Sequence, residues 1–135
     1  MDDRYNTSKL LEVFGVLSMT DEMKAGPNAN QKIIINLLEP GFCKSELTRD
    51  VRGMQLVLYN IMKAVLARTT EVGSRNLVAA AAAGEETHGG YIQDCHLDQV
   101  AAVVRTDKAK KTQDRVWTEL KHTLEEIQPG ITKMI

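Results

Sequence analysis

The length, composition and charge of the chain limit what it can be. Its 135 residues suffice for one domain, and an apolar content of 43% suffices for a packed core. The formal net charge is -1 with basic and acidic residues interspersed, so we expect no nucleic-acid partner. No stretch has the roughly 18 consecutive apolar residues of a membrane span. Cys43 and Cys95 stand far apart, which suggests neither a disulfide framework nor a zinc site. We therefore expect a reduced protein of the cytoplasm.

Two elements are predicted in the first third of the chain. Residues 5–23 have the apolar spacing of an amphipathic helix, at Leu10, Val13, Phe14 and Leu17. Residues 32–38 form a nearly unbroken apolar run rich in isoleucine, and Pro40-Gly41 closes it. Such a run is typical of a central strand in a parallel sheet, because helices cover both of its faces.

The remainder is predicted to be mainly helical. Residues 46–54 are polar and irregular, and a broad apolar helix follows over residues 56–66. Another helix begins at Thr70-Glu71, runs through five alanines and ends at a Gly84 cap. Residues 90–92 are a short candidate strand. Residues 108–127 are expected to form a helix with one apolar face, made by Val116, Trp117, Leu120, Leu124 and Ile127.

This order of elements predicts an α/β fold that is mostly helical, with one or two strands in this chain. A strand buried on both faces needs parallel neighbours, yet only one other weak strand is present. Either the remaining strands of the sheet come from sequence upstream of Met1, or the fold departs from the form that this strand implies. The edges of residues 32–38 would otherwise be exposed and prone to pair with other chains.

Tyr5 and Lys9 are the first candidate site residues. Four residues apart on one helix, they lie on the same face and can meet at a common ligand. A lysine ammonium near a phenol favours the phenolate and lowers the tyrosine pKa, which suits proton exchange with an alcohol or carbonyl oxygen. The same spacing also arises by chance, in which case the pair is a structural feature of a solvated helix face.

The surrounding sequence favours the catalytic interpretation. Tyr5-Asn6-Thr7-Ser8-Lys9-Leu10 is followed by a helix, then by an isoleucine-rich strand that ends in Pro40-Gly41-Phe42-Cys43-Lys44-Ser45. This order resembles the short-chain dehydrogenase/reductase family. Gly73-Ser74-Arg75, the alanine helix, His88-Gly89 and the Trp117 helix are similar to its retinol-dehydrogenase-like branch, in forms common among filamentous fungi. The resemblance implies the C-terminal part of a Rossmann-type doubly wound parallel sheet over residues 1–135.

The resemblance also implies roles for individual residues. Tyr5 would be the catalytic acid/base, and Lys9 would hold the ribose hydroxyls of NADP or NAD and lower the pKa of Tyr5. The Pro40-Gly41 turn would lie against the nicotinamide, with Cys43 and Ser45 completing the cofactor contacts. Cys43 replaces the usual valine or isoleucine, and Ser45 stands where threonine is common. Residues 46–68 would form a substrate lid, whose apolar helix suggests a lipophilic small-molecule substrate.

Two departures from the family pattern stand beside these matches. No glycine-rich turn between a first strand and helix is present to bind the dinucleotide phosphates. Residues 84–90 contain glycines but follow a helix, so we expect a loop there. The family's catalytic serine has no counterpart upstream of Tyr5, and Ser8 lies inside the Tyr-to-Lys interval. The spacing of His88, Asp94, Cys95 and His96 matches no standard metal site.

These observations leave three functional hypotheses. The first is an NAD(P)-dependent oxidoreductase whose dinucleotide-binding half is absent from this chain, so that the isolated chain is inactive. The second is a non-catalytic remnant or interaction module. The third is assembly with a separate chain that supplies the missing half, or a homo-oligomer. No metal is expected at the site in any of the three.

Overall fold

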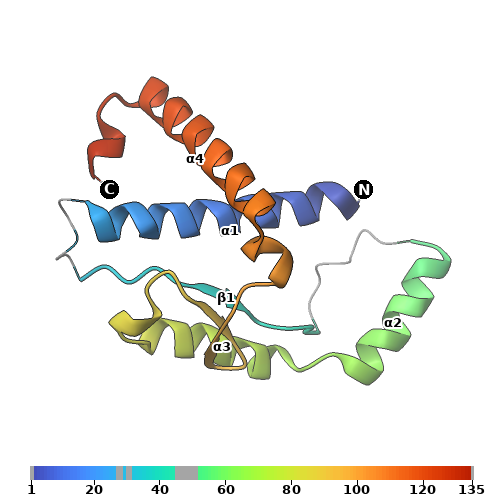
Figure 1. The fold of residues 1–135 in the computed structure, drawn as a ribbon. Coiled ribbons are helices and arrows are strands. Elements are labelled where there is room, and N and C mark those ends of the chain that lie inside the picture. Colours follow the sequence, from blue (N-terminus) through green and yellow to red (C-terminus); the bar gives the residue numbers. More distant parts are fainter. Residues whose placement is uncertain (1, 27–28, 30–31, 45–51, 135) are drawn as a thin grey trace.

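A computed structural model describes residues 2–26, 29, 32–44 and 52–134 of the chain. The helices are α1 (Asp2–Ala25), α2 (Met54–Leu66), α3 (Thr70–Ala82) and α4 (Asp107–Ile127). The strands are β1 (Leu37–Glu39), β2 (Tyr91–Gln93) and β3 (His96–Asp98). Short 3-10 helices are η1 (Glu85–Thr87), η2 (Ala102–Arg105) and η3 (Ile131–Met134). The chain is thus mostly helical around a small sheet, as part of an α/β fold of the Rossmann type would be (Figure 1).

The sheet is mixed and has the strand order β1-β2-β3. β1 and β2 are parallel, with Leu37 opposite Tyr91, and the crossover between them contains α2 and α3. β2 and β3 are antiparallel and form a hairpin, with Tyr91 opposite Asp98. The prediction of parallel pairing for the isoleucine-rich run is therefore confirmed, while the prediction of at most two strands is wrong.

The predicted strand over residues 32–38 is too long. Only Leu37–Glu39 pairs in the ladder, because its partner β2 has only three residues and the Gly89-Gly90 turn comes directly before it. Ile35, two residues before β1, also contacts this turn, since its carbonyl accepts a hydrogen bond from Gly89 N at 2.7 Å. Ile33 and Ile34 are exposed within the described part of the chain.

Strand β3 was not predicted, because its hairpin turn lacks the usual residues. Asp94 and Cys95 form the turn with φ angles of 50° and 64°. Two consecutive positive φ angles are typical of a type I′ turn, which Asn-Gly normally occupies. A turn built from Asp-Cys gives no such signal in the sequence.

Helix α3 packs against β1 and β2. Ala80 on this helix and Ile92 on β2 are both buried. The first turn of α3 is capped by the Thr69 side chain, which accepts a hydrogen bond from Val72 N at 3.2 Å. The predicted Gly84 cap is wrong. The helix ends at Ala82, and Gly84 has a φ of -83°, so the chain leaves α3 extended rather than through a left-handed residue. The predicted loop over residues 84–90 contains η1.

Helices α1 and α4 form the second part of the core, and Figure 1 shows α4 lying across α1. Phe14 and Trp117 are buried between them. Ser18 and Gln113 are buried as well and are joined by a hydrogen bond of 2.9 Å from Gln113 Nε2 to Ser18 Oγ. The predicted helices over residues 5–23 and 108–127 are confirmed and extend slightly further. The ends of their predicted apolar faces, Leu10 and Ile127, are exposed. None of the described helices has the length and apolar character needed to cross a membrane.

Candidate active site

The Tyr5 and Lys9 side chains lie near the beginning of α1 and are both exposed. The ammonium of Lys9 donates hydrogen bonds to both carboxylate oxygens of Glu12, each at 2.9 Å. This hydrogen bond and the charge of Glu12 raise the pKa of Lys9, and Tyr5 makes a smaller electrostatic contribution in the same direction. Lys9 thus has a partner, Glu12, that the sequence pattern did not single out.

The turn after β1 contains the other candidate residues. Pro40 is exposed, Gly41 is half-buried with a φ of 74°, and Cys43 is half-buried. The Cys43 thiol donates a hydrogen bond to the carbonyl of Pro40 at 3.2 Å. A positive φ is the conformation that favours glycine, so Gly41 is required by the shape of the turn. Ser45 and most of the irregular segment 46–54 lie outside the described residues.

Arg68 anchors this turn, and sequence reasoning missed it. Its backbone N–H donates to Phe42 O at 2.8 Å, and its carbonyl accepts from Lys44 N at 2.9 Å. Its guanidinium forms an ion pair with Asp94 in the hairpin turn. The hydrogen bond from Arg68 lowers the pKa of Asp94. No local pattern could have revealed this pair, because its members are 26 residues apart.

Helix α2 stands beside the turn and occupies most of the described part of the expected lid. Tyr59 contacts Phe42 edge-to-face, with ring centroids 5.7 Å apart. The helix carries one basic residue, Lys63, and no acidic residue. Its large exposed apolar side chains are those of Met54, Val57, Leu58, Ile61, Met62, Val65 and Leu66. This surface is apolar, and the lipophilic substrate stays a prediction.

The two groups of candidate residues come from different elements. Figure 1 shows the N-terminal end of α1 and the end of β1 toward the same side of the molecule. Among the described residues, no hydrogen bond or ion pair joins Tyr5 or Lys9 to the Pro40–Cys43 turn. Tyr5 and Lys9 therefore form one set on α1, and Pro40, Gly41 and Cys43 form a second set in the turn after β1. No described hydrogen bond or ion pair joins the two sets.

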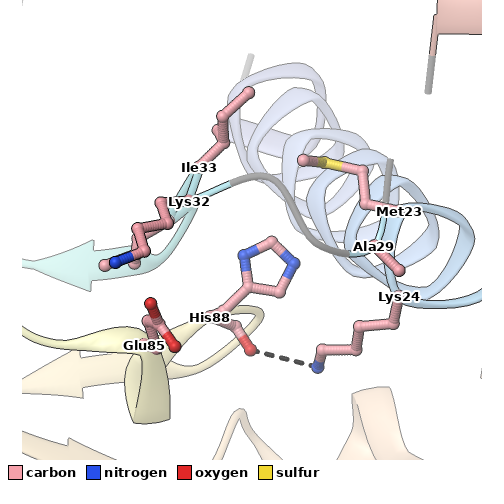
Figure 2. Close-up of a pocket in the computed structure, with 8 residues that line it drawn as sticks. Met23, Lys24, Ala29, Lys32, Ile33, Glu85 and His88 are labelled. Carbon is pink, nitrogen blue, oxygen red and sulfur yellow. Dashed lines mark hydrogen bonds between the residues drawn. The ribbon is translucent and has the colours of Figure 1, made fainter. Parts of the chain in front are cut away.

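A cavity of about 150 Å³ lies at the other end of α1 (Figure 2). His88 Nδ1 accepts a hydrogen bond from Ile35 N at 3.3 Å, and the ammonium of Lys24 donates to His88 O at 3.1 Å. The Lys32 side chain is directed away from the imidazole in Figure 2. The hydrogen bond from Lys24 thus joins the end of α1 to the segment before β2. None of the candidate site residues lines this cavity.

The histidine and cysteine candidates for metal binding are not brought together. Within residues 2–26, 29, 32–44 and 52–134, no three His, Cys, Asp or Glu side chains are grouped as metal ligands would be. Asp94 and Cys95 instead form the hairpin turn, and His96 begins β3.

Curated relatives of known class match almost the whole chain. A short chain dehydrogenase/reductase of Cryptosporiopsis sp. is 46% identical over 131 residues, which are 97% of this chain and 39% of that protein. A short-chain dehydrogenase of Penicillium roqueforti is 39% identical over 134 residues, or 97% of this chain and 35% of the relative. A short chain dehydrogenase of Gibberella zeae is 36% identical over 132 residues, or 97% and 38%. The chain belongs to the short-chain dehydrogenase/reductase family.

The family resemblance seen in the sequence is thereby confirmed, including its fungal character. The chain spans only 35% to 39% of the length of these three dehydrogenases. No family model matches the chain. No solved structure matches it either.

Proposed function

We propose that this short-chain dehydrogenase/reductase chain forms the substrate-side part of an NAD(P)-dependent oxidoreductase. The reaction would interconvert an alcohol and a carbonyl on a lipophilic small molecule. The observation that carries this proposal is the match of 97% of the chain to proteins named as short-chain dehydrogenases, together with the Tyr5 and Lys9 pair on one face of α1.

The donor groups suit the ribose and nicotinamide end of a dinucleotide. Tyr5 and Lys9 offer an exposed hydroxyl and an exposed ammonium four residues apart on one helix. Gly41 gives the Pro40-Gly41 turn its positive φ of 74°, and a Cβ there would be in ordinary contact with the Arg68 guanidinium at 3.4 Å. Cys43 and, outside the described residues, Ser45 are the remaining proposed contacts.

Proton transfer is the part of the reaction that this chain would supply. When bound, NADP or NAD supplies or accepts the hydride. The Tyr5 hydroxyl would give a proton to the carbonyl oxygen during reduction and take one from the alcohol during oxidation. The Lys9 ammonium would hold the ribose hydroxyls and favour the phenolate form of Tyr5. Helix α2 would shield the apolar substrate from water.

The phosphate-binding part of the site must come from other sequence. Among the described residues, no glycine-rich turn leads directly from a strand into a helix, the arrangement that binds a pyrophosphate. We therefore propose that residues 1–135 are part of one domain whose dinucleotide-binding half lies outside them, in the same protein or in a second chain, and that the isolated chain is inactive. We also propose that this protein works in the cytoplasm.

A chimera tests this function. These residues replace the region they match in the Cryptosporiopsis dehydrogenase, and reduction of carbonyl compounds by NADPH and NADH is measured. We expect turnover, and we expect Tyr5→Phe to lower kcat by roughly a hundredfold to ten-thousandfold, because it removes the proton donor. Ser8→Ala is the matched control, since Ser8 lies between Tyr5 and Lys9 and bonds only to Tyr5 O among the described groups. A folded chimera whose activity survives Tyr5→Phe would contradict the proposal.

The alternative is a non-catalytic remnant or interaction module. It is favoured by the engagement of the Lys9 ammonium with Glu12 and by the lack of a described interaction between Tyr5 and the Pro40-Gly41 turn. A folded chimera that neither binds NADPH nor turns over substrate would support this alternative.

A further inference from the structure

Asn76 joins three elements from the interior of α3. Its side chain is 2% exposed, and both ends of its amide are used. Nδ2 donates a hydrogen bond to Glu39 O at the end of β1, at 2.6 Å. Oδ1 accepts a hydrogen bond from Cys95 N in the hairpin turn, at 2.6 Å. An asparagine buried in a helix is costly unless its amide is satisfied, so these contacts account for its presence in the buried face of α3.

Gly73 lies one helical turn before Asn76 and shapes the same contact. A Cβ at this position would lie 2.2 Å from Cys43 Sγ and 3.2 Å from Pro40 O. A side chain at this position would therefore force the Cys43 thiol to move and would press against Pro40 O in the turn that follows β1. Gly73 and Asn76 together form a surface of α3 on which residues 39–43 rest.

The hairpin turn needs support from outside its own sequence. Asp94 and Cys95 have positive φ angles, which non-glycine residues adopt at a cost. Asn76 accepts the Cys95 N–H, and Arg68 pairs with the Asp94 carboxylate while its backbone binds Phe42 and Lys44. The carboxyl ends of β1 and β2 are thus held relative to each other through α3 and Arg68.

We propose that Asn76 is a positioning residue that holds the Pro40-Gly41 turn in place for cofactor binding. This step rests on the proposed function, in which the turn lies against the nicotinamide. Asn76 touches no reacting group itself. It acts by fixing the backbone of Glu39, the residue directly before Pro40, against α3.

Asn36 provides a matched control at the other end of β1. Its Nδ2 also ties the strand to α3 and its following segment, through Ala80 O at 3.0 Å and Thr87 Oγ1 at 3.3 Å. Replacing either asparagine by aspartate removes the donor and keeps an acceptor oxygen. Both changes weaken the packing of β1 on α3, but only the change at Asn76 acts beside the Pro40-Gly41 turn.

The rate of Cys43 alkylation in the intact 135-residue chain reports on the turn. Cys43 is half-buried, with its thiol on Pro40 O and beside Gly73. The native chain is treated with iodoacetamide, and Cys43 and Cys95 are distinguished by peptide mass mapping. We expect Asn76→Asp to speed Cys43 alkylation about tenfold, the effect of losing one buried hydrogen bond. We expect Asn36→Asp to change the Cys43 alkylation rate less than twofold when both variants are compared under conditions that give them the same unfolding midpoint.

Gly73→Ala is the second variant, for use where Asn76→Asp does not fold. It inserts a methyl group 2.2 Å from Cys43 Sγ, so the thiol must move, and it should likewise speed Cys43 alkylation relative to Asn36→Asp. An unchanged Cys43 rate in folded Asn76→Asp, or in folded Gly73→Ala when the former is unfolded, overturns the proposal. Equal acceleration by Asn36→Asp also overturns it. No cofactor is present in the assay, so failure of the chimera to bind NADPH would count against the proposed function alone.

Discussion

At the scale of single residues, Tyr91 and Glu39 meet on one face of the small sheet. The Tyr91 hydroxyl donates a hydrogen bond to a carboxylate oxygen of Glu39. Partial burial, this hydrogen bond and the negative charge of Glu39 raise the pKa of Tyr91 from 10.0 to about 12. The folded chain therefore favours the neutral phenol more than the unfolded chain does. This contribution to stability is complete below pH 10 and is lost as the pH rises through about 12.

We predict that an alkaline absorbance titration of the folded chain contains a tyrosine component near pH 12. Tyr91→Phe should remove this component. Glu39→Gln should lower its midpoint without returning it to 10, because the effect of burial remains. Persistence of this component in Tyr91→Phe, together with its loss in Glu39→Gln, would show that it belongs to a group other than Tyr91.

A second test at this scale concerns the raised pKa of Lys9. The hydrogen bond with Glu12 is the largest cause of this rise, and the charge of Glu12 is the next. We expect Glu12→Gln to lower the Lys9 pKa, measured from the Lys9 side-chain carbon shift by NMR. Glu71→Gln is the control, because Glu71 pairs with Arg75 on α3. A Lys9 pKa that is equal in wild type and Glu12→Gln would show that the ion pair does not form in solution.

At the scale of elements, α1 is held mainly by α4. Phe14 is 3% exposed in this contact, whereas Leu11, on the same helix, is 43% exposed. Ser18 and Gln113 add a buried hydrogen bond, and Lys121 forms an ion pair with Glu22 while lying over the Trp117 ring at 5.8 Å. The orientation of the helix that carries Tyr5 and Lys9 thus depends on residues near the C-terminal end of the chain.

We predict that Phe14→Ala lowers the free energy of unfolding by about 3–5 kcal/mol, the usual loss when a buried phenylalanine is removed. Leu11→Ala should change it by about 0.5 kcal/mol or less. Urea unfolding followed by the fluorescence of Trp117, the single tryptophan, measures both. Phe14→Leu keeps most of the volume and remains measurable where the alanine variant unfolds. Similar losses for Phe14→Ala and Leu11→Ala would mean that the α1–α4 contact does not persist in solution.

At the scale of the whole molecule, the chain leaves apolar surface uncovered next to β1. Ile33 and Ile34 are 49% and 36% exposed, and they lie a few residues before β1, which forms one edge of the sheet. An uncovered apolar strand edge pairs readily with another chain. The occupant that we propose is the dinucleotide-binding half, and in a sample of the isolated chain a second copy would take its place.

We predict that the isolated chain associates as its concentration rises and that Ile34→Lys weakens this association. Sedimentation velocity over a range of concentrations is the measurement. Ile127→Lys introduces the same charge at a 75% exposed position at the end of α4, and it should associate as the wild type does. Equal weakening by both substitutions would indicate a general effect of charge, and a monomeric wild type would show that the edge is protected.

Several features could be predicted from the sequence because they depend on neighbours along the chain. The spacing of apolar residues located α1 and α4, a broad apolar stretch located α2, and the alanine run located α3. The run of isoleucines with Pro40-Gly41 located β1 and its turn. The Tyr5 and Lys9 pair was visible because both residues belong to one helix, where a separation of four places them on one face. The identity of the family followed from the order of these local motifs.

Other features were decided only by the tertiary structure. The length of β1 depends on its partner β2, and the hairpin exists although Asp94-Cys95 is a poor turn sequence. The hairpin is held by Asn76 and Arg68, which are 19 and 26 residues away from their partners. Helical spacing records which residues share a face, but it carries no information about which distant backbone group a buried amide or guanidinium will meet. The sequence alone therefore determined the four predicted α-helices, the approximate position of β1 and the family of this protein. The packing of α3 against two strand ends determined the shape of its candidate site.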